Sequence, residues 1–307
     1  MVEPAPVDKS ALRPAATVML VRDSDLGPEV LMVRRNLNSD FVGGAYVFPG
    51  GGLDAADGAS GLEARAAGRT DAEASALLGI DAGGLAYWVA VLRECFEEAG
   101  VLLATDAEGQ MLSLAAPEDA ARFGEHRRAL NASEVSFDSI IEAEDLHLAV
   151  GSVHYFAHWI TPEGSPRRYD TRFFVARAPE DQVPAHDAAE TIADLWIRPA
   201  DALERHRRGE IELIFPTIRN LQAISRFTTC AELLEAAASA GEIPAILPRI
   251  TATERGVRIL LPGDAGYDDA VVSATPSAPG DFNQTIRDLS LEANAGGGGV
   301  GPEEPSA

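Results

Sequence analysis

The stretch 85–99 constrains this chain most, because its residues favour one long helix with two different faces. Six apolar residues recur at helical spacing and predict a buried stripe made of Leu85, Trp88, Val89, Leu92, Phe96 and Ala99. Glu94, Glu97 and Glu98 lie largely off that stripe, and at positions i, i+3 and i+4 they share one face. Like charges this close raise one another's pKa unless a cation lies among them. A hard divalent cation with oxygen ligands is the natural occupant.

A glycine-rich bend precedes this helix. Residues 46–48 have the pattern of an apolar strand, which Pro49 and the glycines at 50–52 end. Because glycine has no Cβ, such a bend brings bare backbone close to a metal ion or a phosphate. Either motif alone is weak, since an E-x-x-E-E run is usually a solvated helix face. Their order, with an arginine before the acids and a glycine after them, favours a functional site.

The charge balance argues against some classes of partner. The 307 residues carry a formal net charge of −23, from 25 Lys and Arg against 48 Asp and Glu. This argues against broad nucleic-acid or anionic-membrane binding, while local arginines and a metal still suit an anionic small molecule. Two cysteines, Cys95 and Cys230, predict a reducing compartment without a disulfide framework. With no signal-peptide pattern and no apolar run of membrane-spanning length, we expect a cytoplasmic protein.

Composition and periodicity divide the chain into four parts. We expect an unstructured lead-in at 1–14, a main domain at 15–200, a helical extension packed on it at 201–267, and an unstructured tail at 268–307. Residues 58–84, rich in Ala, Gly and Asp, are interpreted as an insertion with short helices. Strands are predicted at 17–21, 30–33, 46–48, 150–159, 171–176, 192–197 and 257–261. Helices are predicted at 85–99 and 200–208, across most of 117–145, and as a pair in 216–240.

Together these residues resemble the signature of the Nudix hydrolases, which runs G, five residues, E, seven residues, and then R-E-U-x-E-E-x-G-U with U apolar. Gly51 and Asp57 match the first part, although Asp replaces Glu, and residues 93–101 match the second. Residues 58–92 number 35 where the family norm is seven, so the signature is interrupted. The interrupted arrangement looks like the branch that contains the peroxisomal coenzyme A diphosphatase and its bacterial relatives. The Nudix resemblance covers about residues 15–200.

The resemblance implies an α/β fold, specifically an α/β/α sandwich with a mixed sheet, a helical insertion inside the signature and a helical C-terminal extension. It also implies Mg²⁺ or Mn²⁺ as cofactor, because Nudix enzymes hydrolyse nucleoside diphosphates, and both the phosphates and the attacking hydroxide are anionic. By resemblance, Glu97 and Glu98 are the primary metal ligands, with the Gly50 carbonyl beside them. Glu94 is a ligand or the general base. Arg93 pairs with a neighbouring carboxylate and orients it.

Further acids and bases complete the expected site. Asp57 either pairs with Arg93, as the acid does in the uninterrupted signature, or acts as a turn residue. Glu190 precedes an expected strand, and several Nudix members use a Glu in a comparable loop as metal ligand or base. A solvated loop residue is the alternative reading. Other candidates for a base, each more often structural in a strand, are His154, His158 and His186.

Substrate contacts are expected from Gly51 in the bend and from arginines. Arg34 and Arg35 end a predicted strand near the bend, and Arg172 forms a second basic cluster with residues 167–168. The arginine fork binds phosphate through two hydrogen bonds, so both clusters are candidates. Surface ion pairing is the alternative for each of them.

Two hypotheses follow from different classes of function. The first is a Mg²⁺- or Mn²⁺-dependent diphosphatase that cleaves coenzyme A or an acyl-CoA to 3′,5′-ADP and (acyl-)phosphopantetheine. Its substrate rests on the branch resemblance alone, so ADP-ribose, NADH and nucleotide-sugar diphosphates stay open. The second is a Nudix fold kept as a ligand-binding or regulatory module. Such modules commonly lose the acids that are kept here, which favours an enzyme. The sequence leaves a homodimer open.

Overall fold

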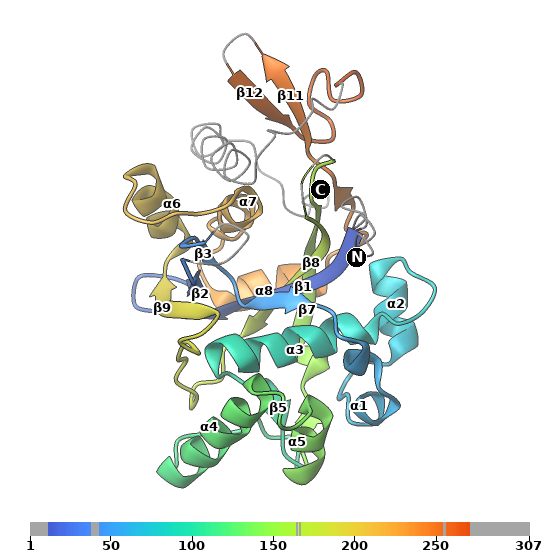
Figure 1. The fold of residues 1–307 in the computed structure, drawn as a ribbon, viewed down its shortest axis with the longest axis vertical. Helices are drawn as coiled ribbons and strands as arrows, with labels where there is room; N and C mark the ends of the chain where they lie inside the picture. The colour runs from blue at the N-terminus through green and yellow to red at the C-terminus, as the bar shows by residue number, and fades with distance from the viewer. Residues whose placement is uncertain (1–11, 38–42, 164, 166, 254–255, 271–307) are drawn as a thin grey trace, which may run out of the picture.

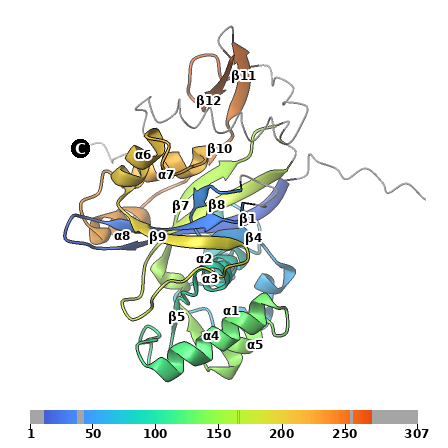
Figure 2. The ribbon, with the colours of Figure 1, turned by 60° about the vertical axis from the view of Figure 1, so that its left-hand side comes forward.

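Figures 1 and 2 show a computed structural model of the chain, which describes residues 12–37, 43–163, 165, 167–253 and 256–270. Its centre is an eight-stranded mixed sheet in the order β10-β7-β8-β1-β2-β3, with β4 paired to β1 and β9 paired to β2. These strands are β1 (Leu12–Arg22), β2 (Glu29–Arg35), β3 (Tyr46–Val47), β4 (Gly50–Gly52), β7 (Val153–Ile160), β8 (Arg168–Arg177), β9 (Thr191–Ile197) and β10 (Ala245–Ile246). Two small sheets pair β5 (Ala104–Thr105) with β6 (His147–Leu148), and β11 (Arg249–Thr253) with β12 (Gly256–Leu260).

Helices cover both faces of the central sheet (Figure 2). One face carries η1 (Ala55–Gly58), α1 (Ser60–Ala64), α2 (Asp71–Leu78), α3 (Leu85–Ala99), α4 (Pro117–Asn131), α5 (Phe137–Ala143) and the short η2 (Val150–Ser152). The other face carries α6 (Pro199–Arg207), α7 (Phe215–Ile224) and α8 (Cys230–Ala238). Each helical layer closes its own hydrophobic core against the sheet. The predicted α/β/α sandwich is confirmed.

Strand β1 shows why the sheet is buried on both sides. Val18 and Leu20 pack into the core under α3, while Met19 and Val21 pack into the core under α7 and α8. The strand runs parallel to β8 from Leu12 to Val21 and antiparallel to β2 at its C-terminal end. It begins at Leu12, so residues 12–14 belong to the sheet and not to an unstructured lead-in, because β8 offers them a hydrogen-bonding edge. The rest of the expected lead-in, 1–11, lies outside the described residues.

Helix α3 has the predicted bounds, and the insertion helps to begin it. The N-cap residue of α3 is Gly84, which has no side chain to accept a hydrogen bond from the first turn of the helix. Asp71 of α2 takes that role, since its carboxylate accepts the backbone N–H groups of Gly83 and Leu85 at 3.0 and 2.9 Å. At the other end Gly100 adopts φ 69°, the left-handed conformation that ends helices. The insertion therefore packs against the helix that carries the carboxylates.

The C-terminal extension contains the predicted helices and also strands. Its strand β10 joins the central sheet beside β7, where Ile246 pairs with Trp159. The hairpin β11–β12, whose second strand overlaps the strand predicted at 257–261, stands beyond the sandwich at the top of Figure 1. Most of the expected tail, 271–307, lies outside the described residues. In the part of the chain that the structure describes, no helix has the length and apolar character to cross a bilayer.

Candidate active site

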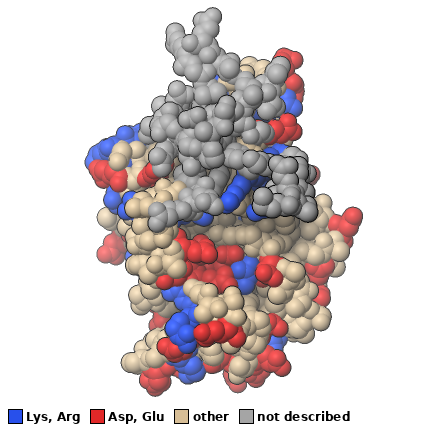
Figure 3. Space-filling model, in the orientation of Figure 1, with Lys and Arg blue, Asp and Glu red and all other residues tan. Residues whose placement is uncertain are grey.

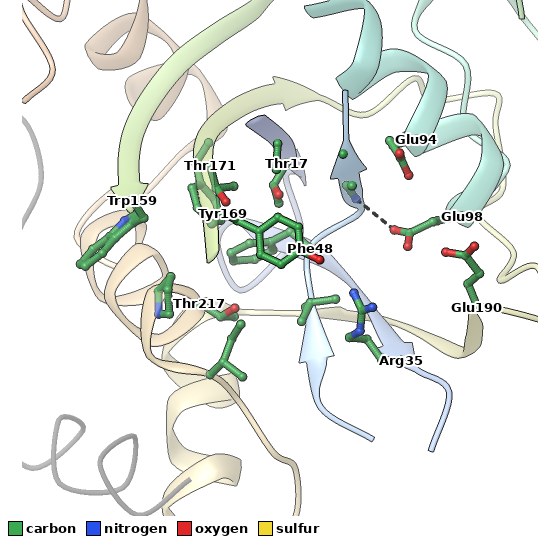
Figure 4. Close-up of a pocket in the computed structure, with 18 of the residues that line it drawn as sticks. Thr17, Arg35, Phe48, Glu94, Glu98, Trp159, Tyr169, Thr171, Glu190 and Thr217 are labelled. Carbon is green, nitrogen blue, oxygen red and sulfur yellow. Dashed lines mark hydrogen bonds between the residues drawn. The ribbon is translucent and has the colours of Figure 1, made fainter. Parts of the chain in front are cut away.

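One large pocket lies between α3, the glycine bend and the C-terminal extension. Its volume is about 660 Å³, within the ~300–1,000 Å³ usual for small-molecule sites. In Figure 4 the carboxylates of Glu94, Glu98 and Glu190 lie on one side of this space, while Trp159 and Thr217 lie on the other. We call these parts the acidic end and the far half. Figure 3 shows Asp and Glu side chains gathered in the centre of the face that it presents.

Arg93 joins the two halves of the interrupted signature. Its Nε and Nη2 donate to the Asp57 carboxylate at 2.8 and 3.0 Å, and Nη2 also donates to the Gly52 carbonyl at 3.0 Å. Its Nη1 donates to Glu94 and Glu97 at 2.9 and 2.8 Å. Burial favours the neutral guanidine, but the hydrogen bonds to Asp57 and the surrounding carboxylates raise the pKa of Arg93 above its ordinary value. The insertion therefore does not separate the two halves of the signature, because Asp57 and Arg93 remain in direct contact.

Asp57 both pairs with Arg93 and acts as a turn residue. Besides pairing with Arg93, its carboxylate accepts the backbone N–H of Asp54 at 2.7 Å and completes a capping box at the start of η1. The side chain is 2% exposed. One carboxylate thus fixes the turn that follows the glycine bend and the arginine that orients the acids of α3.

The bend fits the carboxylates only because it is made of glycine. The Gly50 N–H donates to Glu98 at 3.0 Å, and Gly50 itself lies against β1, where a Cβ would meet the Ala16 carbonyl oxygen at 2.4 Å. A Cβ at Gly51 would lie 2.4 Å from Oε1 of Glu94. Backbone and carboxylates are therefore in direct contact at this bend.

The acidic end concentrates negative charge in a buried place. Burial, together with the charge of Glu94, raises the pKa of Glu98 to about 8. Burial raises the pKa of Glu94 to about 7 against the opposing effect of Arg93, and it also raises the pKa of Glu97. The charge of Glu190 adds to the rise in all three. A cation among these groups would stabilise their ionised forms.

The donor set fits a hard divalent cation. Among the described residues no three His, Cys, Asp or Glu side chains are already placed as a metal cluster. The reason is visible in the contacts: Arg93 holds one oxygen each of Glu94 and Glu97, and the Gly50 N–H holds one of Glu98. The carboxylates of Glu94, Glu98 and Glu190 nevertheless lie together on one side of the pocket, beside the backbone of the bend (Figure 4). Oxygen donors that do not rigidly enclose the ion suit Mg²⁺, which keeps several of its waters.

A tight turn brings Glu190 into the pocket. Asp187 accepts the backbone N–H groups of Ala189, Glu190 and Thr191 at 3.2, 3.1 and 2.8 Å, and the Glu190 carbonyl accepts the Asn36 N–H at 2.8 Å. Both acids line the pocket. The candidate histidines are not among its described lining residues: His158 pairs with Asp170, and His186 pairs with Asp194.

The structure separates the candidate arginines by strand alternation. Arg35 lines the acidic end, close enough to Glu98 for its charge to act against the rise in that pKa, whereas Arg34 donates to the Gly44 carbonyl at 3.1 Å. Arg172 is not brought to the pocket. Thr171 and Phe173 line the pocket, so Arg172 between them faces the opposite side of the sheet. There it is 4% exposed and donates to Asp170 and to the Tyr87 hydroxyl.

The sequence missed the far half altogether. Its residues include Trp159, Phe173, Phe215, Thr217, Pro248 and Ile259. They come from β7, β8, α7, the segment after β10, and β12, and each has the pattern of an ordinary core or surface position in its own element. No local motif unites them.

Comparison with known proteins identifies the family. Residues 69–224, about half of the chain, match the family model described as the NUDT19 Nudix domain. The chain belongs to this Nudix family. It is similar to the acyl-coenzyme A diphosphatase NUDT19 of Gallus gallus, with 29% identity over 305 residues that cover 84% of this chain and 80% of that protein. The human protein of the same name is 28% identical over 275 residues, covering 78% of this chain and 72% of that protein.

A solved structure supports the same assignment. The crystal structure of a Nudix hydrolase from Alicyclobacillus acidocaldarius aligns with a TM-score of 0.58 and 29% identity, covering 74% of this chain and 96% of that one. The Nudix sandwich predicted from the sequence is confirmed, and the protein is a Nudix hydrolase.

Proposed function

We propose that this Nudix hydrolase cleaves the diphosphate of coenzyme A or an acyl-CoA and releases 3′,5′-ADP and (acyl-)phosphopantetheine. The observation that carries the reaction class is the group of carboxylates, Glu94, Glu98 and Glu190, around the bare backbone of Gly50 and Gly51. The printed names of the avian and human relatives support the substrate class. ADP-ribose, NADH and nucleotide sugars are the alternative substrates.

The cofactor in this proposal is Mg²⁺ or Mn²⁺. Glu97 and Glu98 would hold it, with the Gly50 carbonyl beside them and Glu94 as a further ligand or as the base. When bound, such an ion neutralises phosphate charge and makes water more acidic. The cluster of buried carboxylates with raised pKa values supports this assignment, because these groups lack sufficient opposing charge in the protein itself.

The chain's own residues have distinct roles in the reaction. Arg93 is a positioning residue, since its Nη1 holds the carboxylates of Glu94 and Glu97 at fixed places. Attack forms a new P–O bond from water and breaks the P–O–P bridge, and the proton of the water passes to a carboxylate oxygen. Glu94, with a pKa of about 7, and Glu190 are the two candidates for that base. Arg35 contacts phosphate oxygens from the side of β2.

Steady-state kinetics on a substrate panel test this proposal. CoA, an acyl-CoA, ADP-ribose and NADH should be compared with Mg²⁺, with Mn²⁺ and with EDTA, and the products identified by mass spectrometry. We expect the highest kcat/KM with CoA or acyl-CoA and no turnover in EDTA. Faster cleavage of ADP-ribose or NADH would overturn the substrate and keep the reaction. No turnover of any member with either metal would instead favour a binding module.

A further inference from the structure

The far half of the pocket differs chemically from the acidic end. Trp159, Phe173, Phe215, Pro248 and Ile259 contribute aromatic or aliphatic groups to its lining. Every charged side chain among the described lining residues belongs to the acidic end, where Arg35 lies near Glu98 and Arg93 pairs with neighbouring carboxylates. A phosphate placed in the far half would therefore be buried without a cation, at a cost of several kcal/mol. This region suits a neutral group.

The far half nevertheless offers an unpaired hydrogen-bond donor beside the start of a helix. Trp159 is 3% exposed, packs edge-on against Phe215 with ring centroids 5.8 Å apart, and has no partner for its indole N–H among the described residues. Helix α7 begins beside it, and its N-cap residue, Ile214, makes no side-chain capping hydrogen bond. Thr217, 2% exposed, lines the pocket from the first turn of this helix. Buried donors of this kind require acceptors, which an amide or thioester carbonyl provides.

We propose that the far half binds the neutral (acyl-)pantetheine arm of the substrate, and that the C-terminal extension sets the preference for the acyl chain. This rests on the proposed function. Carbonyl oxygens of the arm accept hydrogen bonds from the Trp159 indole and from the first turn of α7. The acyl chain packs against Pro248 and Ile259. The phosphorylated adenosine then lies at the acidic end, where Arg35 lines the pocket.

The extension is suited to this task by its position. Pro248 follows β10, which is fixed in the sheet beside β7, and Ile259 lies on β12 of the hairpin outside the sandwich. Ile259 packs partly against the core under α7, so its place at the pocket is held by the fold. The hairpin can thus change the pocket's length without disturbing the acids on α3. Selection for chain length is separated in this way from the chemistry of hydrolysis.

Product binding to Trp159→Phe tests the direction of the substrate. The substitution keeps an aromatic ring beside Phe215 but removes the pyrrole part of the indole with its N–H. We expect the Kd of phosphopantetheine, measured by calorimetry on the intact chain with Mg²⁺, to rise about 3- to 10-fold, as for one lost hydrogen bond. The Kd of 3′,5′-ADP, which lacks the arm, should stay the same. Thr217→Val, which removes only a hydroxyl, provides a second variant should the first fail to fold.

Chain-length kinetics on Ile259→Trp test the role of the extension. We expect the wild type to show a rising kcat/KM from free CoA through acetyl-CoA to octanoyl-CoA. The larger ring should lower kcat/KM for octanoyl-CoA about 10-fold or more while changing that for free CoA less than about 2-fold, as for a filled apolar subsite. Arg258→Trp is the matched control, because this neighbouring side chain is exposed and does not line the pocket. It should leave the whole series unchanged.

The outcomes separate this inference from the proposed function. If the wild type cleaves no CoA compound, the proposed function fails and the inference fails with it. If CoA is cleaved but Trp159→Phe weakens 3′,5′-ADP and not phosphopantetheine, the arm lies elsewhere and the inference alone is overturned. The same holds if Ile259→Trp lowers all chain lengths equally, or if Arg258→Trp has the same effect as Ile259→Trp.

Discussion

The acidic end and the far half of the pocket are built in opposite ways. The acidic end takes most of its groups from one helix and one bend, residues 50–52 and 93–98, joined by the contact of Arg93 with Asp57. The far half collects single side chains from β7, β8, α7 and β12, spread over residues 159–259. In our proposal, hydrolysis therefore depends on a local motif, while recognition of the substrate depends on how distant segments pack. Substitutions at the two ends should accordingly affect different kinetic constants.

The largest effect is expected from Glu98→Gln at the acidic end. The amide keeps an oxygen for the Gly50 N–H, at 3.0 Å in the present structure, but removes the charge. We expect kcat to fall about 100-fold or more, as for loss of one group that stabilises charge in the transition state. The melting temperature without metal should not fall, because a buried carboxylate with raised pKa is replaced by a neutral group.

The control for this variant is Glu235→Gln on α8, an exposed side chain away from the pocket. It should change neither kcat nor stability. Near-normal turnover by Glu98→Gln would show that this residue is not a metal ligand and that the acidic end is misassigned.

A neighbouring pair of glycines gives a finer test of the same end. Gly51→Ala would place a Cβ 2.4 Å from Oε1 of Glu94, whereas a Cβ at Gly52 would meet nothing closer than 4.0 Å. Because the carboxylate is the flexible end of a side chain, it can move away and the fold should survive. We expect Gly51→Ala to lower kcat about 10- to 100-fold, as for loss of an orienting contact to a ligand, and Gly52→Ala to have little effect. Equal activity of the two variants would argue against a functional placement of Glu94 beside the bend.

The acidic end was predictable because its information is local. Helical spacing places Glu94, Glu97 and Glu98 on one face, and the glycines predict that the backbone of the bend lies close to other groups of the site. The bounds of α3 and the pairing of β1 with β2 follow from local patterns in the same way. The capping of α3 by Asp71 could not be predicted in this way. Asp71 lies in the insertion, fourteen positions before Leu85, whose backbone N–H its carboxylate accepts.

The candidate arginines show the same limit of prediction from local sequence. The doublet Arg34–Arg35 and the cluster at Arg172 look equivalent as phosphate-binding charges in the sequence. Only the packing of the sheet decides which face meets the pocket, and it selects Arg35. Strand alternation alone predicts that neighbouring residues face opposite ways, but it does not say which face holds the substrate. For that reason the far half could not be predicted from the sequence, because none of its residues belongs to a motif.

Paired substitution of these arginines gives the smallest of the expected effects and separates binding from stability. Arg35→Met should raise KM about 10-fold, because a charge-assisted hydrogen bond to phosphate is lost. Arg172→Met should leave KM unchanged and lower the unfolding free energy by about 2 kcal/mol, because its hydrogen bonds to Asp170 and the Tyr87 hydroxyl disappear. Kinetics and urea unfolding on both variants measure the two quantities. A raised KM in Arg172→Met, at unchanged stability, would mean that the face of β8 opposite the pocket takes part in substrate binding after all.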